Sequence, residues 1–174
     1  MSNEVEEIKN KVANSGLEPL NLGDFYPEGT RVIIDLKDHL FEGLILKEKD
    51  FRAFLKNEDW SKYQNKYVAI TSSTDAIIPH WAYMLLASEL QPFAKKVVSG
   101  NSDTLEAIIF SESIKENLHP EQYKDKRVMI RGCGDKELPI SAFSDAVTLL
   151  KPYAKSIMYG EACSNVPIYK SKTL

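Results

Sequence analysis

The chain has 174 residues, of which 43% are hydrophobic and 27% are charged, and its formal net charge is −3. This composition is ordinary for a soluble globular protein, and an acidic balance without a block of Lys or Arg argues against nucleic-acid binding. No apolar run reaches the ~20 residues of a membrane helix, and the N-terminus is acidic rather than a signal peptide, so we expect a cytoplasmic protein without membrane contact. Two cysteines are too few for a disulfide scaffold, so we expect reduced thiols and a single domain over residues 1–174.

The region before residue 66 is predicted to alternate helices and strands. Its apolar spacing and turn residues predict a polar helix, a loop, two strands and a short helix, over residues 3–15, 20–26, 31–36, 41–46 and 49–55. The short helix is expected to pack Phe51, Phe54 and Leu55 inward.

Residues 126–160 are an imperfect copy of residues 66–100, displaced by 60 positions without a gap. The two windows share 11 identical residues of 35, whereas unrelated windows would share about two, which predicts a duplication. The identical pairs are Lys66/Lys126, Val68/Val128, Ile70/Ile130, Asp75/Asp135, Pro79/Pro139, Ala82/Ala142, Leu90/Leu150, Pro92/Pro152, Ala94/Ala154, Lys95/Lys155 and Gly100/Gly160.

Each repeat has the pattern of a strand, a polar loop, a helix and a second strand. The strands are predicted at 68–71, 94–98, 128–131 and 154–158, with helices that end near Leu90 and Leu150 before the prolines. This order is a βαβ unit, whose two strands run parallel. We therefore predict an α/β fold with a mainly parallel sheet built from two duplicated βαβ units, related by a pseudo-twofold axis, with helices packed on the sheet. The strand order stays open.

Two further elements are expected outside the repeats. Residues 102–117 are predicted to form the helix that joins the repeats, with Ser102 or Asp103 as its N-cap. Residues 166–169 are predicted to form an edge strand, where Pro167 is tolerated.

Both cysteines follow a predicted strand of the second repeat, in loops that also contain an acidic residue. Because parallel strands end at one edge of a sheet, Cys133, Asp135, Glu161 and Cys163 are expected to converge there, with the two cysteine Cα atoms within about 8 Å. Thiolates and carboxylates suit zinc, iron or an iron–sulfur cluster. The spacing itself is not diagnostic, since the chain has no C-x-x-C.

His80 is a further candidate ligand or acid–base group. It lies in the predicted first turn of the helix of the first repeat, near Asp75, and its counterpart in the second repeat is the apolar Ile140. The alternative is a hydrogen-bonded structural imidazole beside Trp81.

Three other interpretations of the candidate residues stay open. Both cysteines suit small buried hydrophobic positions. In a small thiol enzyme, Cys133 would be a nucleophile whose pKa is lowered by the following helix N-terminus. A non-enzymatic interaction module or homodimer would use aromatic surface residues, such as Trp60, Trp81, Tyr83 and Tyr159.

Three segments carry a resemblance to a known family: LILKEKDFRAFLKNEDWSKYQNKYVAITSSTDAIIPHWAYMLL, RGCGDKELP and AKSIMYGEACSNVPIYK. The chain from about Asn10 onward resembles the family called domain of unknown function 2480. The resemblance implies a single-domain cytoplasmic protein with no assigned activity. Genes of the family often lie beside genes for iron–sulfur cluster assembly, which favours a thiolate site at Cys133 and Cys163.

Overall fold

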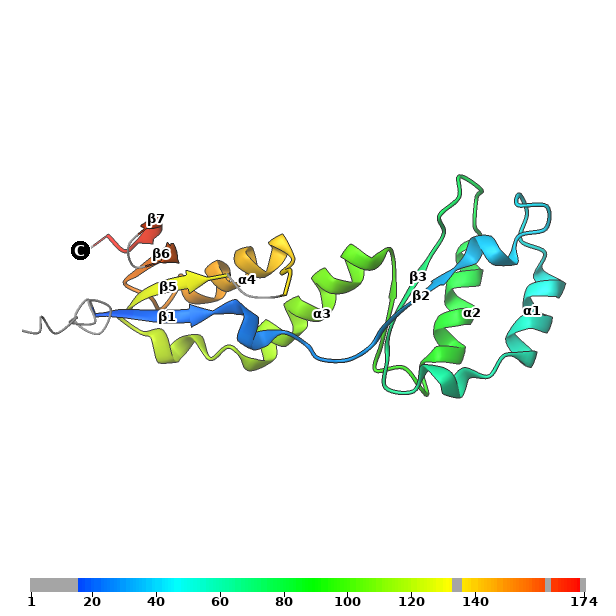
Figure 1. Cartoon of the computed structure of the whole chain (residues 1–174), viewed down its shortest axis with the longest axis horizontal. Helices are drawn as coiled ribbons and strands as arrows, with labels where there is room; N and C mark the ends of the chain where they lie inside the picture. Colours follow the sequence, from blue (N-terminus) through cyan, green and yellow to red (C-terminus); the bar gives the residue numbers. More distant parts are fainter. Residues whose placement is uncertain (1–15, 133–135, 162–163, 173–174) are drawn as a thin grey trace, which may run out of the picture. The chain divides into compact units, whose positions relative to one another are not determined.

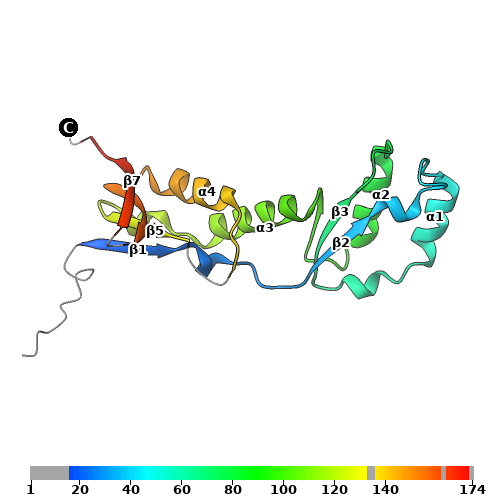
Figure 2. The same cartoon turned by 45° about the horizontal axis from the view of Figure 1, so that its top comes forward.

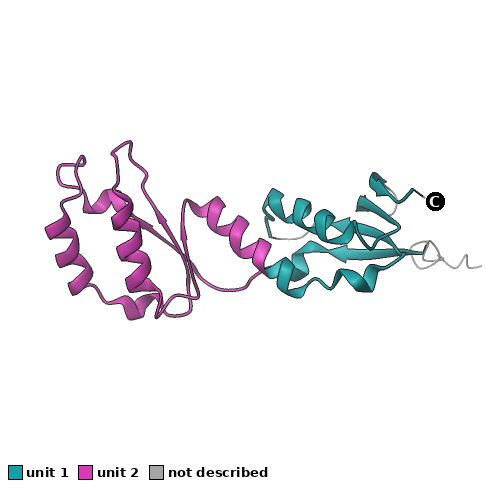
Figure 3. Ribbon diagram, turned by 180° about the vertical axis from the view of Figure 1, so that it is seen from behind, with its two compact units in different colours: residues 1–26, 113–174 teal, residues 27–112 magenta. Residues whose placement is uncertain are grey.

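The computed structural model describes residues 16–132, 136–161 and 164–172. The chain divides into two compact units, shown in two colours in Figure 3. Unit 1 comprises Met1–Tyr26 and Ser113–Leu174, and unit 2 comprises Pro27–Glu112. The sequence of unit 2 is therefore inserted within that of unit 1. The single domain over residues 1–174 stays a prediction.

Unit 2 is built on a parallel sheet of three strands. The sheet order is β2 (Arg31–Asp35), β3 (Tyr67–Thr71) and β4 (Lys96–Ser99). Its helices are α1 (Glu48–Asn57), α2 (His80–Leu90) and most of α3 (Ser102–Asn117), with 3₁₀ helices at Leu36–His39 and Trp60–Tyr63.

Helices cover both faces of this sheet, as Figure 1 shows for α2. Side chains alternate along a strand, so Val68 and Ile70 of β3 enter the core that includes residues of α1 and α2. Ala69 lies in a second cluster with Leu105 and Ile109 of α3. A strand buried on both faces has a continuous apolar run, which explains the YVAI sequence of β3.

The start of α3 is fixed by a side-chain cap. Asn101 Oδ1 accepts hydrogen bonds from Thr104 N at 2.9 Å and Thr104 Oγ1 at 2.8 Å. The predicted caps, Ser102 and Asp103, are instead the first residues of the helix. Bounds shift easily by one residue because Asn, Ser and Asp are all good cap residues.

Unit 1 contains a sheet of four described strands, and Figures 1 and 2 show how these strands lie side by side. Three parallel strands are followed by an antiparallel edge strand, in the order β1 (Leu17–Asn21), β5 (Arg127–Arg131), β6 (Ser156–Glu161) and β7 (Ser164–Lys170). The other elements are α4 (Ile140–Leu150), the last residues of α3, and 3₁₀ helices at Leu22–Phe25 and Pro120–Tyr123.

Several predicted elements are confirmed. The helix predicted over 102–117 has those bounds, and the helix predicted over 49–55 is α1. Both repeat helices end at Leu90 and Leu150, and the two strands of each repeat pair in parallel. The segment around Pro167 is an edge strand.

Three predictions about the sheet are corrected. Residues 17–21 form β1, whereas the sequence predicts a loop from residue 20, because the pairing with β5 compensates for a sequence with a single buried residue, Leu20. Residues 41–46 form one isolated bridge around a turn, since Glu42 and Gly43 have φ of 51° and 70°. The described strands form two sheets rather than one. The strands of the first repeat, β3 and β4, form a sheet with β2, whereas those of the second repeat, β5 and β6, form a sheet with β1. The helix predicted over 3–15 lies outside the described residues.

Candidate functional site

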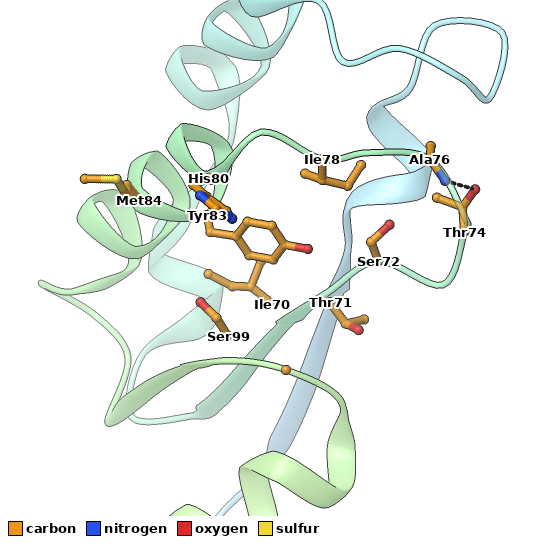
Figure 4. A pocket seen from close by; sticks show the side chains of 11 residues that line it. Ile70, Thr71, Ser72, Thr74, Ala76, Ile78, His80, Tyr83, Met84 and Ser99 are labelled. Atoms are coloured by element: carbon orange, nitrogen blue, oxygen red, sulfur yellow. Dashed lines mark hydrogen bonds between the residues drawn. The ribbon is translucent and has the colours of Figure 1, made fainter.

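Unit 2 contains an open pocket of about 680 Å³ at the carboxyl ends of β3 and β4 (Figure 4). Its lining combines hydroxyl groups, one imidazole and an apolar wall, from residues Ile70, Thr71, Ser72, Thr74, Ala76, Ile78, His80, Tyr83, Met84, Ser99 and Gly100. In open parallel sheets this edge is the usual position of ligand sites. The pocket therefore lies where the parallel crossover predicts a site.

The loop between β3 and α2 forms one wall of the pocket. Pro79 is extended, with φ −61° and ψ 138°, and α2 begins at the next residue, His80. No side chain caps this helix, so the backbone N–H groups of His80 and Trp81 have no side-chain cap, while that of Ala82 donates to the Pro79 carbonyl oxygen at 3.0 Å. The sequence places these groups there because proline readily begins a helix.

Asp35 at the end of β2 holds this loop. Its Oδ1 accepts hydrogen bonds from Ser73 N at 3.1 Å and Lys37 N at 3.0 Å, and Lys37 Nζ lies 3.4 Å from Oδ2. Burial raises the pKa of Asp35, but the hydrogen bonds from Ser73 and Lys37 outweigh it and lower the pKa to about 2. The carboxylate is thus ionised and committed to the loop that carries Ser72.

Hydrogen-bond donors converge on the pocket from two elements. Tyr83 extends from α2 across the pocket toward Ser72, which follows β3 (Figure 4). Ser72 Oγ is shielded from solvent and has no hydrogen-bond partner among the described residues. His80 is exposed at the rim, and no Asp, Glu, Lys or Arg belongs to the lining. The arrangement can donate hydrogen bonds to a small polar group.

A cavity at the matching position of unit 1 is smaller and apolar. It measures about 290 Å³ and is lined by Ile130, Ile140, Phe143, Ser144, Val147, Tyr159 and Ile168. At an offset of 60 residues, Ile140 corresponds to His80, Phe143 to Tyr83, and Tyr159 to Ser99.

An aromatic pair and a glycine account for the smaller cavity. The rings of Phe143 and Tyr159 meet edge to face, with centres 5.6 Å apart. Gly132, which corresponds to Ser72, lies against the first ring, and a Cβ atom there would be 2.4 Å from Phe143 Cζ. A side chain at position 132 would therefore displace the ring.

The predicted metal ligands fall into different parts of the structure. Glu161 Oε2 lies 3.2 Å from Arg131 Nη2, so this carboxylate forms an ion pair at the carboxyl ends of β6 and β5. His80 belongs to unit 2 and lines its pocket. Cys133, Asp135 and Cys163 lie outside the described residues. Within the ranges that are described, no group of three or more His, Cys, Asp or Glu side chains is arranged to hold a metal ion.

The aromatic residues predicted for an interaction surface also differ in exposure. Trp60 is buried, with 7% of its surface exposed, and its Nε1 donates to the Leu55 carbonyl oxygen at 3.0 Å. Its assignment to the surface is wrong because the 3₁₀ turn directs the indole into the core. Trp81 is half-buried with its ring centre 5.8 Å from that of Phe51, whereas Tyr159 is 41% exposed.

Sequence reasoning missed the hydroxyl groups of the pocket. Ser72, Tyr83 and Ser99 are common residue types in no recognised pattern, so each alone carries no signal. The usable signal was the comparison of the repeats, in which Ser99 is replaced by Tyr159 and His80 by Ile140.

Comparison with known proteins gives one match. A family model described as "Protein of unknown function (DUF2480)" matches residues 6–171. No curated protein and no solved structure matches the chain. Within the described residues, no helix has the length and apolar character needed to cross a membrane.

Proposed function

We propose that this chain, which belongs to the DUF2480 family of proteins of unknown function, binds a small polar molecule in the pocket of unit 2. The observation that carries the proposal is the contrast between two matching positions. Unit 1 has Phe143 and Tyr159 at this position, and unit 2 has Tyr83 and Ser99 around a larger, hydroxyl-lined space.

The size and position of the pocket support binding of a whole small molecule. Its volume of about 680 Å³ falls within the range of about 300–1,000 Å³ that is usual for ligand sites. The shielded Ser72 Oγ supports a polar ligand, because an unpaired hydroxyl costs free energy that a bound acceptor would recover. The proposal concerns binding and includes no covalent step.

The test uses the ¹H–¹⁵N NMR spectrum of the full chain with four probes, which are glycerol, butyramide, butyrate and inorganic phosphate. At least one probe is expected to shift the backbone amides of Ser72, His80 and Gly100 in a saturable manner. The Ser99→Tyr variant, which introduces the residue of unit 1, should abolish these shifts by filling the pocket. Tyr159→Ser in unit 1 is the matched control and should leave them unchanged. If no probe shifts these amides, the proposal is wrong.

A second candidate function is a metal or iron–sulfur site at Cys133 and Cys163, with Asp135 as a further ligand. One observation favours it: β5 and β6 are adjacent parallel strands, and their last residues, Arg131 and Glu161, form an ion pair. The segments that carry the cysteines thus begin at one edge of the sheet. Glu161 is a weaker candidate ligand than the sequence suggests, because Arg131 already neutralises it.

Elemental analysis of anaerobically purified protein tests this second function, together with its absorption spectrum. About one equivalent of zinc or iron, lost in both Cys133→Ser and Cys163→Ser, is expected. Metal-free protein in which one cysteine alkylates rapidly would instead favour the small thiol enzyme.

We also propose that the two units arose by duplication of a βαβ unit and are related by a pseudo-twofold axis. The support is the equal offset of 60 residues between their elements. It separates β3 from β5, α2 from α4, and the start of β4 from that of β6. An experimental structure in which the two crossovers differed in handedness would contradict the proposal.

A further inference from the structure

We infer that the pocket of unit 2 selects a carboxylate, specifically a small aliphatic molecule with a single negative charge. This inference rests on the proposed function, because it names the class of ligand for the same pocket. The polar groups define the charged end of the ligand, and the apolar wall defines its remainder.

Hydrogen-bond donors at one end of the pocket require an acceptor. The hydroxyl of Ser72 is shielded and has no partner among the described residues, and Tyr83 extends toward it (Figure 4). A carboxylate has two oxygen atoms, so it can accept hydrogen bonds from donors on two elements. Hydrogen bonds to an ionised acceptor are also stronger than those to a neutral one.

The helix N-terminus at the edge of the pocket favours an anion. The uncapped N-terminus of α2, a helix of 11 residues, contributes a partial positive charge at His80. No carboxylate belongs to the pocket lining, and Asp35, which holds the adjacent loop, is already bound by Ser73 N and Lys37. The pocket lining therefore offers a cationic ligand no negatively charged side chain to pair with.

The amount of positive charge distinguishes a carboxylate from a phosphate. No Lys or Arg lines the pocket, and a helix N-terminus is equivalent to about half an elementary charge. This balances one negative charge better than the nearly two of a phosphate group at neutral pH, which proteins usually bind with Arg or Lys.

An apolar wall faces the rest of the ligand. Ile70, Ile78 and Met84 belong to the lining beside the hydroxyl groups. Met84 is 70% exposed, so a ligand over it would remove apolar surface from water. A short aliphatic chain on the carboxylate suits this wall.

The closing experiment compares butyrate with butyramide, which has nearly the same shape without the charge, and with butylammonium and inorganic phosphate. We expect butyrate to shift the amides of Ser72 and His80 with an affinity at least about 10-fold higher than that of butyramide. Ser72→Ala should weaken butyrate about 10-fold, because a hydrogen bond to a charged group is lost. Ser88→Ala, at an exposed position of α2 outside the pocket, is the matched control and should change nothing.

Each other outcome has a defined meaning. Equal binding of butyrate and butyramide at these amides overturns the carboxylate inference and leaves the proposed function standing. Tighter binding of phosphate or butylammonium overturns it in favour of that ligand. Unchanged butyrate affinity in Ser72→Ala removes the inferred hydrogen bond and overturns the inference. If none of the probes, including glycerol, shifts the pocket amides, both proposals fail.

Discussion

Unit 2 has a hydroxyl-lined pocket where unit 1 has a smaller apolar cavity, although β3 and α2 of unit 2 have the same bounds as β5 and α4 of unit 1 at an offset of 60 residues. The elements thus determine where the hollow lies, and a few side chains determine its chemistry. Replacement of Ser99 by Tyr159 and of Ser72 by Gly132 coincides with an aromatic pair in the space. A functional assignment therefore depends on these side chains rather than on the architecture.

The two units differ also in what their matching helices face. In unit 2, Trp81 of α2 packs against Phe51 of α1, with ring centres 5.8 Å apart. In unit 1, α4 has Ser141 at the position of Trp81, and at the same offset α1 corresponds to the end of α3, where Ser111 stands at the position of Phe51. Substitutions that give one unit the residue of the other therefore test how each residue depends on the packing around it.

The largest effect on stability is expected from Leu86→Ala, which gives α2 the alanine that α4 has at the corresponding position, Ala146. Leu86 is fully buried, so the change leaves a cavity and should lower the free energy of unfolding by about 3 kcal/mol. Urea unfolding followed by circular dichroism measures it. The reverse change, Ala146→Leu, should cost about 2 kcal/mol through overpacking. Two neutral substitutions would show that these positions are not packed as described.

Gly132→Ser, which gives unit 1 the residue at Ser72, is expected to have the next largest effect. The new Cβ atom would lie 2.4 Å from Phe143 Cζ, so the ring must move, at a cost of about 2 kcal/mol. Gly23→Ser is the matched control, because a Cβ atom there meets nothing within 4 Å. Equal losses in both variants, measured by urea unfolding, would contradict the steric explanation.

Asp35→Asn gives unit 2 the residue that unit 1 has at the matching strand end. Asp35 of β2 pairs with Thr71 of β3, and Asn21 of β1 pairs with Arg131 at the corresponding position of β5. The folded pKa of about 2 lies below the unfolded value of about 4, so the stabilisation is present above pH 4 and is lost as the pH falls toward 2. At pH 6 the variant should be less stable by about 1 kcal/mol, since solvent near the carboxylate reduces the full linkage value.

The measurement is urea unfolding of Asp35→Asn and of the parent protein at several values between pH 2 and 6. The stability difference should shrink as the pH falls through this window. Asp38→Asn, at an exposed position of the 3₁₀ helix that follows Asp35, is the control. A difference that stayed constant with pH would exclude the predicted linkage.

Ser72→Ala should have the smallest effect on stability, and of opposite sign. Removal of a shielded hydroxyl without a partner among the described residues should raise the free energy of unfolding of the ligand-free protein by up to about 1 kcal/mol. Thermal unfolding in the absence of carboxylates measures this gain. Ser99→Ala, at an exposed position of the same pocket, should be nearly neutral. A destabilised Ser72→Ala variant would mean that the hydroxyl already has a partner.

Most of the regular structure was accessible from the sequence because its signals are local. Prolines before and after each repeat helix fix the ends of α2 and α4, and a run of polar cap residues marks the start of α3. β1 was missed because its Leu-Glu-Pro-Leu-Asn sequence forms a strand only through pairing with β5. The segment 41–46 was misassigned because its apolar residues suggest a strand, whereas Glu42 and Gly43 form a turn.

The candidate site was only partly accessible for a related reason. His80 was identified and the carboxyl edge was predicted as the location, and both belong to the pocket of unit 2. The role of Ser72 depends on the shielding of one oxygen atom, which is a property of packing and not of residue type. Glu161 illustrates the converse, since a carboxylate of suitable type is already paired with Arg131.

The insertion of unit 2 within the sequence of unit 1 imposes an order of events during synthesis on the ribosome. The three strands of unit 2 lie in one continuous segment, and its sheet needs no residue after 112. The first strand of unit 1 pairs Leu17 with Arg127, so it must wait for the entire inserted segment to emerge. Domains generally fold as the chain appears, and the intervening loop is entropically cheaper to close once it has become compact. Early folding of unit 2 would thus bring the two parts of unit 1 within reach of each other.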